Sequence, residues 1–306
     1  MKYKLYKEAS EIVSNSIHII GATRSGTTLF EQLISSLKNV ECYDEPALLR
    51  VLLPLIGSIP KKEFQILFEA YLFEERMMYS IPGRNINLNK FDMSSIYNSK
   101  DKKEIESRLS KSYRRLEIFP KAIKSSIAFK QVEISQYLRE FIDYYPMMRT
   151  ILLIRSPEGV INSINQKKWF SDEQLFNNSG KWFFKRGTNW NIPDWLENNE
   201  RKKFLKMNET DRALFYYQSE YKNFIKCLKL KKFKPLIIDY DDFTKNPDLI
   251  FSSTTKSIKE NYGKLTNKIL RSIRINSSSQ KNLIDFDKKL LENCKKLYEI
   301  CYSSII

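Results

Sequence analysis

A glycine-bounded loop between a short strand and a helix is the feature that most constrains this chain. Residues 16–21 form an apolar, β-branched run that ends at Gly21, and residues 27–37 repeat leucine and isoleucine at helical spacing. Gly21 and Gly26 have the spacing of a phosphate-binding loop. The segment therefore predicts a strand, a P-loop-like turn and a helix.

Strand and helix patterns continue to alternate along the chain. Residues 149–155 are apolar on both faces, which is typical of a strand inside a parallel sheet. The other expected strands are 39–43, 126–131 and 234–239, and the expected helices are one that opens at Pro46, then 61–80, 135–145, 158–166, 212–230, 243–262 and 284–301. This order predicts a three-layer α/β/α fold with a mostly parallel central sheet, whose ligands bind at the carboxyl ends of the strands.

The length of 306 residues fits one domain that spans residues 1–306. We expect insertions at 50–120 and 167–205. The first includes a charged, weakly patterned stretch that favours a surface location. The second holds all four tryptophans among polar residues, which favours a loop-rich lid over a core helix.

The composition argues against a membrane-spanning, a secreted and a zinc- or disulfide-stabilised protein. No stretch reaches the roughly 20 apolar residues of a membrane-spanning helix, and the first residues lack the apolar region of a signal peptide, so we expect a cytoplasmic protein. The four cysteines lie far apart without a Cys-x-x-Cys pair, which argues against a zinc site or a disulfide framework. We expect buried thiols and no metal.

The single histidine, His18, lies inside the first expected strand. One buried histidine cannot supply a Ser-His-Asp triad or a multi-histidine metal centre. Any proton transfer must therefore come from carboxylates, lysine or tyrosine.

The loop lacks the lysine of nucleoside triphosphatases, because Thr27 stands in its place. This argues against transfer of a γ-phosphoryl group. Backbone N–H groups of residues 25–28 can still bind an anion at the helix N-terminus, with Arg24 as its cation. The alternative is a β-α turn that binds nothing.

The stretch Gly-Ala-Thr-Arg24-Ser25-Gly26-Thr27-Thr28 resembles the 5′-phosphosulfate loop of sulfotransferases that use 3′-phosphoadenosine 5′-phosphosulfate (PAPS). A second, independent stretch, Leu-Leu-Ile-Arg155-Ser-Pro, with Ser163 eight residues after the arginine, resembles the 3′-phosphate segment of the same family. An arginine fork and a hydroxyl on the next helix can both point at one phosphate.

Two weaker matches extend the resemblance over residues 16–260. They are Ala-Phe-Lys130-Gln and a segment that begins Asp239-Tyr240, which we expect to be scaffold. The resemblance implies that Arg24, Ser25, Gly26, Thr27 and Thr28 hold the 5′-phosphosulfate and that Arg155 and Ser163 hold the 3′-phosphate. It further implies that Lys130 neutralises charge near the transferred group, that the product is 3′,5′-adenosine bisphosphate, and that no metal takes part.

Glu45 is the candidate base. Carbohydrate and tyrosylprotein sulfotransferases use a glutamate, and Glu45 matches the tyrosylprotein branch in its spacing from the loop, although the arginine that follows there is Ala47 here. The alternative is that Asp44 or Glu45 only caps the helix that opens at Pro46.

The sequence leaves two alternatives for each of the candidate adenine-binding residues. Trp169 and Trp182 follow the 3′-phosphate helix and are either an adenine clamp or packing residues. Residues 277–281, with Arg274 nearby, are either a loop that closes over the phosphates or an exposed turn.

The resemblance implies transfer of a sulfuryl group to a hydroxyl or amine of an acceptor, for which we expect a carbohydrate or another small hydroxylated compound. A net charge of +16 would attract an anionic co-substrate. The alternatives are a P-loop kinase of a small metabolite and a basic nucleic-acid-binding protein, although no nucleic-acid motif is recognised. The sequence does not indicate the oligomeric state.

Overall fold

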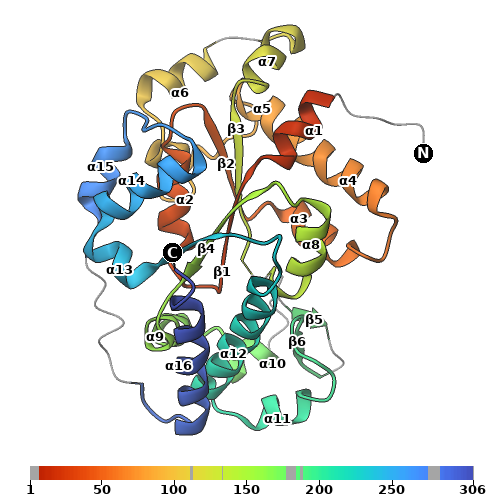
Figure 1. The fold of residues 1–306 in the computed structure, drawn as a ribbon, viewed down its shortest axis with the longest axis vertical. Helices are drawn as coiled ribbons and strands as arrows, with labels where there is room; N and C mark the ends of the chain where they lie inside the picture. The colour runs from red at the N-terminus through yellow and green to blue at the C-terminus, as the bar shows by residue number, and fades with distance from the viewer. Residues whose placement is uncertain are drawn as a thin grey trace.

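A parallel sheet forms the centre of the computed structural model (Figure 1). The structure describes residues 7–110, 113–132, 134–176, 184–186, 189–274 and 283–305. Five strands pair in parallel in the order β2-β3-β1-β4-β7. They are β1 (Ile17–Gly21), β2 (Val40–Asp44), β3 (Ser126–Lys130), β4 (Arg149–Ile154) and β7 (Leu236–Asp239), and an antiparallel pair, β5 (Phe184–Arg186) and β6 (Asn191–Pro193), lies apart from them.

Helices cover both faces of the sheet (Figure 1). The α-helices are α1 (Lys7–Ser14), α2 (Thr27–Ser35), α3 (Ala47–Leu52), α4 (Lys61–Ala70), α5 (Met78–Ser80), α6 (Lys102–Leu109), α7 (Arg115–Ala122), α8 (Leu138–Tyr144), α9 (Pro157–Gln166), α10 (Asp172–Phe176), α11 (Arg201–Lys206), α12 (Glu209–Leu228), α13 (Tyr240–Lys245), α14 (Pro247–Ile258), α15 (Thr266–Ser272) and α16 (Lys288–Tyr302). Short 3₁₀ turns η1 (Leu53–Leu55), η3 (Ile96–Asn98) and η4 (Ser135–Tyr137) and a π-helical segment, η2 (Tyr71–Met77), lie between them.

Side-chain alternation along the strands separates two cores. Ile17 and Ile19 of β1 pack with residues of α2, α13, α14 and α15 on one face. Ile20 packs with residues of α4, α8, α9, α12 and α16 on the other. Alternate residues of a strand point to opposite faces, so a buried strand of this kind needs an apolar layer on each side. The three-layer α/β fold is confirmed.

The chain order places a topological switch point between β1 and β4. From β1 the chain continues to β2 on one side of the sheet, whereas from β4 it continues to β7 on the other. The loops that follow these two neighbouring strands therefore diverge, and α/β proteins bind ligands in the crevice between such loops.

The expected strands are all present, and most differences concern helix ends. Pro46 is the N-cap of α3 and not its first helical residue. The predicted helix 61–80 is present but passes through the π-helical segment η2. The helices that the sequence pattern did not predict are α1, α6, α7, α10, α11 and α15. Their short lengths leave too few periodic positions to detect.

Part of the tryptophan-rich segment belongs to the core. Trp195 is buried, and its ring lies 5.6 Å from the ring of Phe204 and 6.1 Å from that of Phe170. Trp195 is therefore a core residue, because aromatic side chains of α11 and α12 surround it. Trp195 lies outside the helices and strands, so no hydrophobic periodicity indicates its burial.

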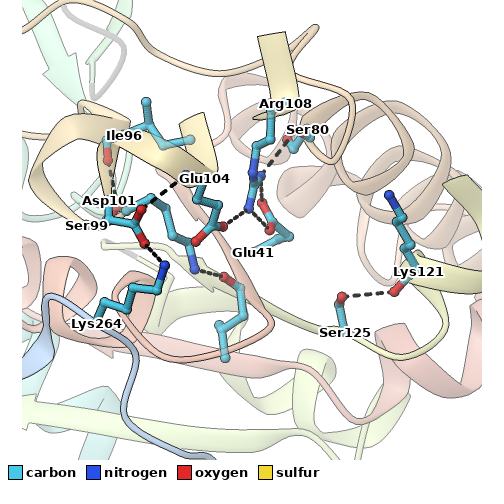
Figure 2. Close-up of polar contacts among 12 residues, drawn as sticks. Glu41, Ser80, Ile96, Ser99, Asp101, Glu104, Arg108, Lys121, Ser125 and Lys264 are labelled. Carbon is cyan, nitrogen blue, oxygen red and sulfur yellow. Dashed lines mark hydrogen bonds and ion pairs between the residues drawn. The ribbon is translucent and has the colours of Figure 1, made fainter. Parts of the chain in front are cut away.

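The segment between η2 and α7 covers the exposed edge of β2. Arg108 of α6 donates to Glu41 of β2 at 2.6 and 2.9 Å, to Glu104 at 2.6 Å and to the carbonyl oxygen of Ser80 at 3.3 Å (Figure 2). Burial alone would raise the pKa of Glu41, but Arg108 outweighs it and holds that pKa below its usual value. This buried ion pair fixes α6 to the edge of the sheet.

Other features of the sequence have plain outcomes. No helix of the described residues is long and apolar enough to cross a membrane. All four cysteines are free thiols; Cys227, Cys294 and Cys301 are buried and Cys42 is half-buried.

His18 predicts a specific acid sensitivity. It is wholly buried, its ring stacks 4.5 Å from that of Phe129, and burial lowers its pKa from 6.5 to about 3. Between pH 6.5 and 3, His18 is protonated in the unfolded chain and neutral in the folded protein. The stability of the fold therefore falls as pH falls. We expect His18→Phe to reduce the fall in Tm between pH 7 and pH 4. Identical pH profiles for the two proteins would contradict this.

Candidate functional site

Polar residues follow the carboxyl ends of all five parallel strands. Glu45 follows β2, Lys130 ends β3, Arg24 follows β1, Arg155 follows β4 and Tyr240 follows β7. Parallel strands bring these ends to one edge of the sheet. The residues that the sequence singled out thus gather along one side of the molecule.

The loop after β1 has the backbone of an anion-binding turn. Arg24 and Gly26 both adopt left-handed conformations, with φ of 68° and 89°. The Oγ of Ser25 is fully buried and has no hydrogen-bond partner among the described residues. The first N–H groups of α2 have no partner inside the helix and point to the same side. An anion at this position would satisfy these donors.

The Tyr240 ring packs directly against the loop after β1. A Cβ atom built on Gly26 would lie 1.9 Å from the Tyr240 ring, so only glycine fits there. The centre of the Tyr240 ring also lies 5.0 Å from Cζ of the Arg155 guanidinium. The segment expected to be scaffold therefore contacts two of the predicted binding residues, a role that its sequence alone did not indicate.

Arg155, Arg24 and Ser163 lie close together in the structure. Arg155 Nη1 donates to the Arg24 carbonyl oxygen at 2.8 Å, and Arg24 Nε donates to Ser163 Oγ at 2.9 Å. Arg155 Nε lies 3.6 Å from Asp241 Oδ1, and a Cβ atom at Gly159 would approach that Nε to 2.5 Å. Gly159 thus leaves room for the guanidinium beside α9.

Buried tyrosines of α12 hold the loops in place. Tyr217 and Tyr221 donate to the Arg155 carbonyl oxygen at 2.8 and 3.0 Å, and the Arg155 N–H donates to the Tyr221 hydroxyl at 2.9 Å. The Thr23 N–H donates to the Tyr216 hydroxyl at 2.8 Å. Sequence analysis missed these residues, although tyrosines spaced four apart on an otherwise apolar helix face could have indicated them.

Lys130 is the centre of a second cluster. Its Nζ donates to Thr28 Oγ1 at 3.0 Å and lies 2.5 Å from Asp44 Oδ1 and 3.2 Å from Glu45 Oε1. Burial lowers the pKa of Lys130, but Asp44 and Glu45 outweigh it, and the net pKa is raised. Lys130 is therefore a charged amine fixed beside the start of α2.

Glu45 is held in an unusual conformation. Its φ of 37° lies in the left-handed region, which is strained for a residue with a side chain. Its carboxylate pairs with Arg50 and Lys130, and its side chain keeps 26% exposure. The N-cap of α3 is Pro46 without a side-chain cap bond, so the helix-capping alternative is wrong.

Arg50 supplies a cation that sequence analysis missed. The family resemblance implied an arginine at position 47, where this chain has alanine. Arg50 lies one turn further along α3, and its Nη2 reaches Glu45 Oε2. A search for arginine one helical turn beyond Ala47 would have found it.

The Arg24 side chain contacts the segment that follows β4. Its guanidinium lies beside Ser163 and 5.6 Å from the Trp169 ring, on the side of Arg155 and not of Lys130. Trp169 is half-buried and packs against the core. Trp182 and residues 277–281 lie outside the described residues, whereas Arg274 is described and exposed.

Chemically, the site offers two sets of cationic and N–H donors on either side of β1. Lys130 lies on the neighbour β3 and Arg155 follows the neighbour β4, so about 10 Å of sheet separates their strands. Such a site fits a ligand with two anionic groups. In the part of the chain that the structure describes, no three His, Cys, Asp or Glu residues are grouped to hold a metal ion.

Comparison with known proteins gives one family. A model of the Sulfotransferase family matches residues 16–258. No curated protein sequence matches the chain.

Solved structures share the fold. A sulfotransferase domain from the curacin biosynthetic pathway superposes with a TM-score of 0.53 at 13% identity, covering 92% of this chain and 97% of that one. A sulfotransferase domain from the Synechococcus PCC 7002 olefin synthase has a TM-score of 0.47 at 13% identity, with 93% of each chain covered. At this identity the first similarity shows the fold.

The contact between Gly26 and Tyr240 predicts the outcome of two glycine substitutions. Gly57 is also left-handed, with φ of 76°, but has no heavy atom near its added Cβ. Gly57→Ala should cost about 1–2 kcal/mol, since it carries only backbone strain. Gly26→Ala adds a clash with Tyr240, and thermal melts should show a clearly larger loss of Tm. Equal losses would contradict the close packing of this loop.

Proposed function

Because the chain belongs to the sulfotransferase family, we propose that it transfers a sulfuryl group from PAPS to a hydroxyl of a carbohydrate or another small hydroxylated acceptor. Sulfuryl transfer itself is the activity of the family. The observation that carries the choice of PAPS is the contact between two segments far apart in sequence: Arg155 to the Arg24 carbonyl and Arg24 to Ser163. One adenosine with phosphates at both ends would engage both sides of β1.

The residues of the chain fit such a co-substrate. The N–H groups at the start of α2, the orphaned Ser25 hydroxyl and the Thr27 and Thr28 hydroxyls form the half that would receive the 5′-phosphosulfate. Arg155 and Ser163 form the half that would receive the 3′-phosphate. Arg24 lies on this second half, so we assign it to the 3′ side.

Lys130 would stabilise the charge that develops on the leaving phosphate. It already contacts Thr28 at the start of α2, and its amine is charged. A fixed cation at this position needs no rearrangement as charge develops, which is the main source of electrostatic catalysis. PAPS supplies the reactive sulfur–oxygen bond to the phosphate.

Glu45 would accept the proton of the acceptor. As the acceptor oxygen bonds to sulfur, the bond from sulfur to the phosphate oxygen breaks and its electron pair stays on the phosphate. Arg50 and Lys130 each pair with one Glu45 oxygen and fix the carboxylate. Each carboxylate oxygen has a second lone pair, and the half-exposed side chain leaves it accessible.

The nucleotide assignment is tested by thermal shift with 3′,5′-adenosine bisphosphate and with Mg·ATP. A ligand at a hundredfold excess over its Kd stabilises the fold by about 2.7 kcal/mol, so the bisphosphate should raise the Tm of the wild type by a few degrees. Arg155→Ala should abolish the shift and Arg155→Lys should weaken it, because lysine lacks the planar fork.

Arg115→Ala is the matched control, since Arg115 pairs with Glu74 in an exposed position. It should leave the shift unchanged. Stabilisation by Mg·ATP alone, or a bisphosphate shift that is indifferent to Arg155, would reject the assignment.

The role of Glu45 is tested by Glu45→Gln. This variant should keep the bisphosphate-induced Tm shift and lose about 100- to 10,000-fold in kcat with any acceptor that the wild type uses. Asp44→Asn, measured alongside, tests the neighbouring carboxylate, and Glu74→Gln serves as an exposed control. Full activity of Glu45→Gln would show that another group takes the proton.

A further inference from the structure

A small polar cavity lies beside the edge strand β2, next to the proposed transfer site. It has a volume of about 110 Å³ and is bounded by α2, β2, the π-helical segment η2 and residues 80–100. Asp44, whose carboxylate holds Lys130, forms part of its wall. The cavity and the transfer site therefore share this residue.

The wall of the cavity is firmly built. Glu41 and Ser80, which line it, both accept hydrogen bonds from Arg108 (Figure 2). Lys100 is buried, and its Nζ donates to the carbonyl oxygens of Leu37 and Val40 at 3.0 Å each. The shape thus does not depend on a ligand.

Two polar atoms at the cavity lack partners. Glu31 lies one turn after Thr28 on α2 and is only 4% exposed, yet its Oε2 has no hydrogen-bond partner among the described residues. The buried Nε of Arg76 is likewise unsatisfied. Buried polar groups without a partner are costly, so a ligand or water is expected to satisfy them.

Arg76 is positioned by unusual backbone. It lies on the π-helical segment η2, and its guanidinium lies 4.9 Å from the Tyr43 ring. Segments of π-helix are rare and are frequent at functional sites. This observation is independent of the unsatisfied atoms.

The charges of the cavity select the chemistry of its ligand. Arg108 pairs with Glu41 and Lys130 pairs with Asp44, so these two carboxylates do not favour an ammonium group. The mostly polar wall disfavours an apolar group. Hydroxyl groups both donate and accept, and therefore match the carboxyl oxygen of Glu31 and the N–H of Arg76 at once.

We propose that this cavity binds a cluster of hydroxyl groups on the acceptor, such as the vicinal hydroxyls of a sugar, and so selects the acceptor. The proposal rests on the proposed function and names its substrate class. Burial and then Asp44 raise the pKa of Glu31 to about 8. The raised pKa favours the protonated carboxyl group of Glu31, which can donate as well as accept.

Saturation-transfer NMR on the protein saturated with 3′,5′-adenosine bisphosphate tests the proposal. The probes are methyl β-glucoside, methyl β-galactoside and N-acetylglucosamine, with cyclohexylmethanol and cyclohexylamine as comparison compounds. Sugars should receive saturation and the comparison compounds should not. Glu31→Met and Arg76→Met should weaken sugar binding about tenfold or more, because each removes a buried hydrogen-bonding group.

Matched variants separate the chemistry from the fold. Glu31→Gln keeps a neutral donor and acceptor and should retain sugar binding. Lys121→Met should also retain it, because Lys121 lines the neighbouring cavity instead. If Glu31→Met is too unstable to study, the half-buried Asn85→Ala should show a smaller loss in the same direction.

The outcomes distinguish this inference from the proposed function. No Tm shift with the bisphosphate would reject the nucleotide assignment. A normal shift without a sugar signal, equal signals from cyclohexylmethanol, or sugar binding unchanged in both methionine variants would overturn the hydroxyl-binding cavity alone. Such results would mean that the cavity holds water only.

Discussion

The hydrogen bond from the Arg155 side chain to the Arg24 carbonyl joins the two loops at the switch point of the sheet. It fixes the end of β4 to the loop after β1, and Arg24 then reaches Ser163 on α9. The guanidinium is buried, so bulk water screens its interactions less than at the surface. The tyrosines of α12 bind the backbone of the same two loops. The proposed cleft depends on these hydrogen bonds.

Electrostatics divide the site into a binding half and a reacting half. Arg155 lies near one carboxylate, Asp241, whereas Lys130 lies between Asp44 and Glu45. A cation between two carboxylates holds them at fixed positions, and Glu45 is the one that we propose as the base. The strained backbone of Glu45 fits this view, because such strain persists only where surrounding contacts enforce it.

The sheet and the loops after β1 and β4 were predictable because their signals are local. A buried strand, a glycine turn and an arginine at a strand end are each visible within a few residues. The partners that position them were not, because Tyr217, Asp241 and Arg50 act through contacts that only the folded chain creates. The cavity near Glu31 was not predicted for the same reason, because its far wall comes from η2 and residues 80–100. Trp195 is likewise a core residue through neighbours distant in sequence.

A crystal structure with 3′,5′-adenosine bisphosphate bound tests the central claim most directly. The account predicts one nucleotide across β1, with its 5′-phosphate on the N–H groups of residues 25–28 and its 3′-phosphate within hydrogen-bond distance of Arg155 and Ser163. A nucleotide bound elsewhere, or one whose 3′-phosphate faces solvent away from Arg155, would contradict it.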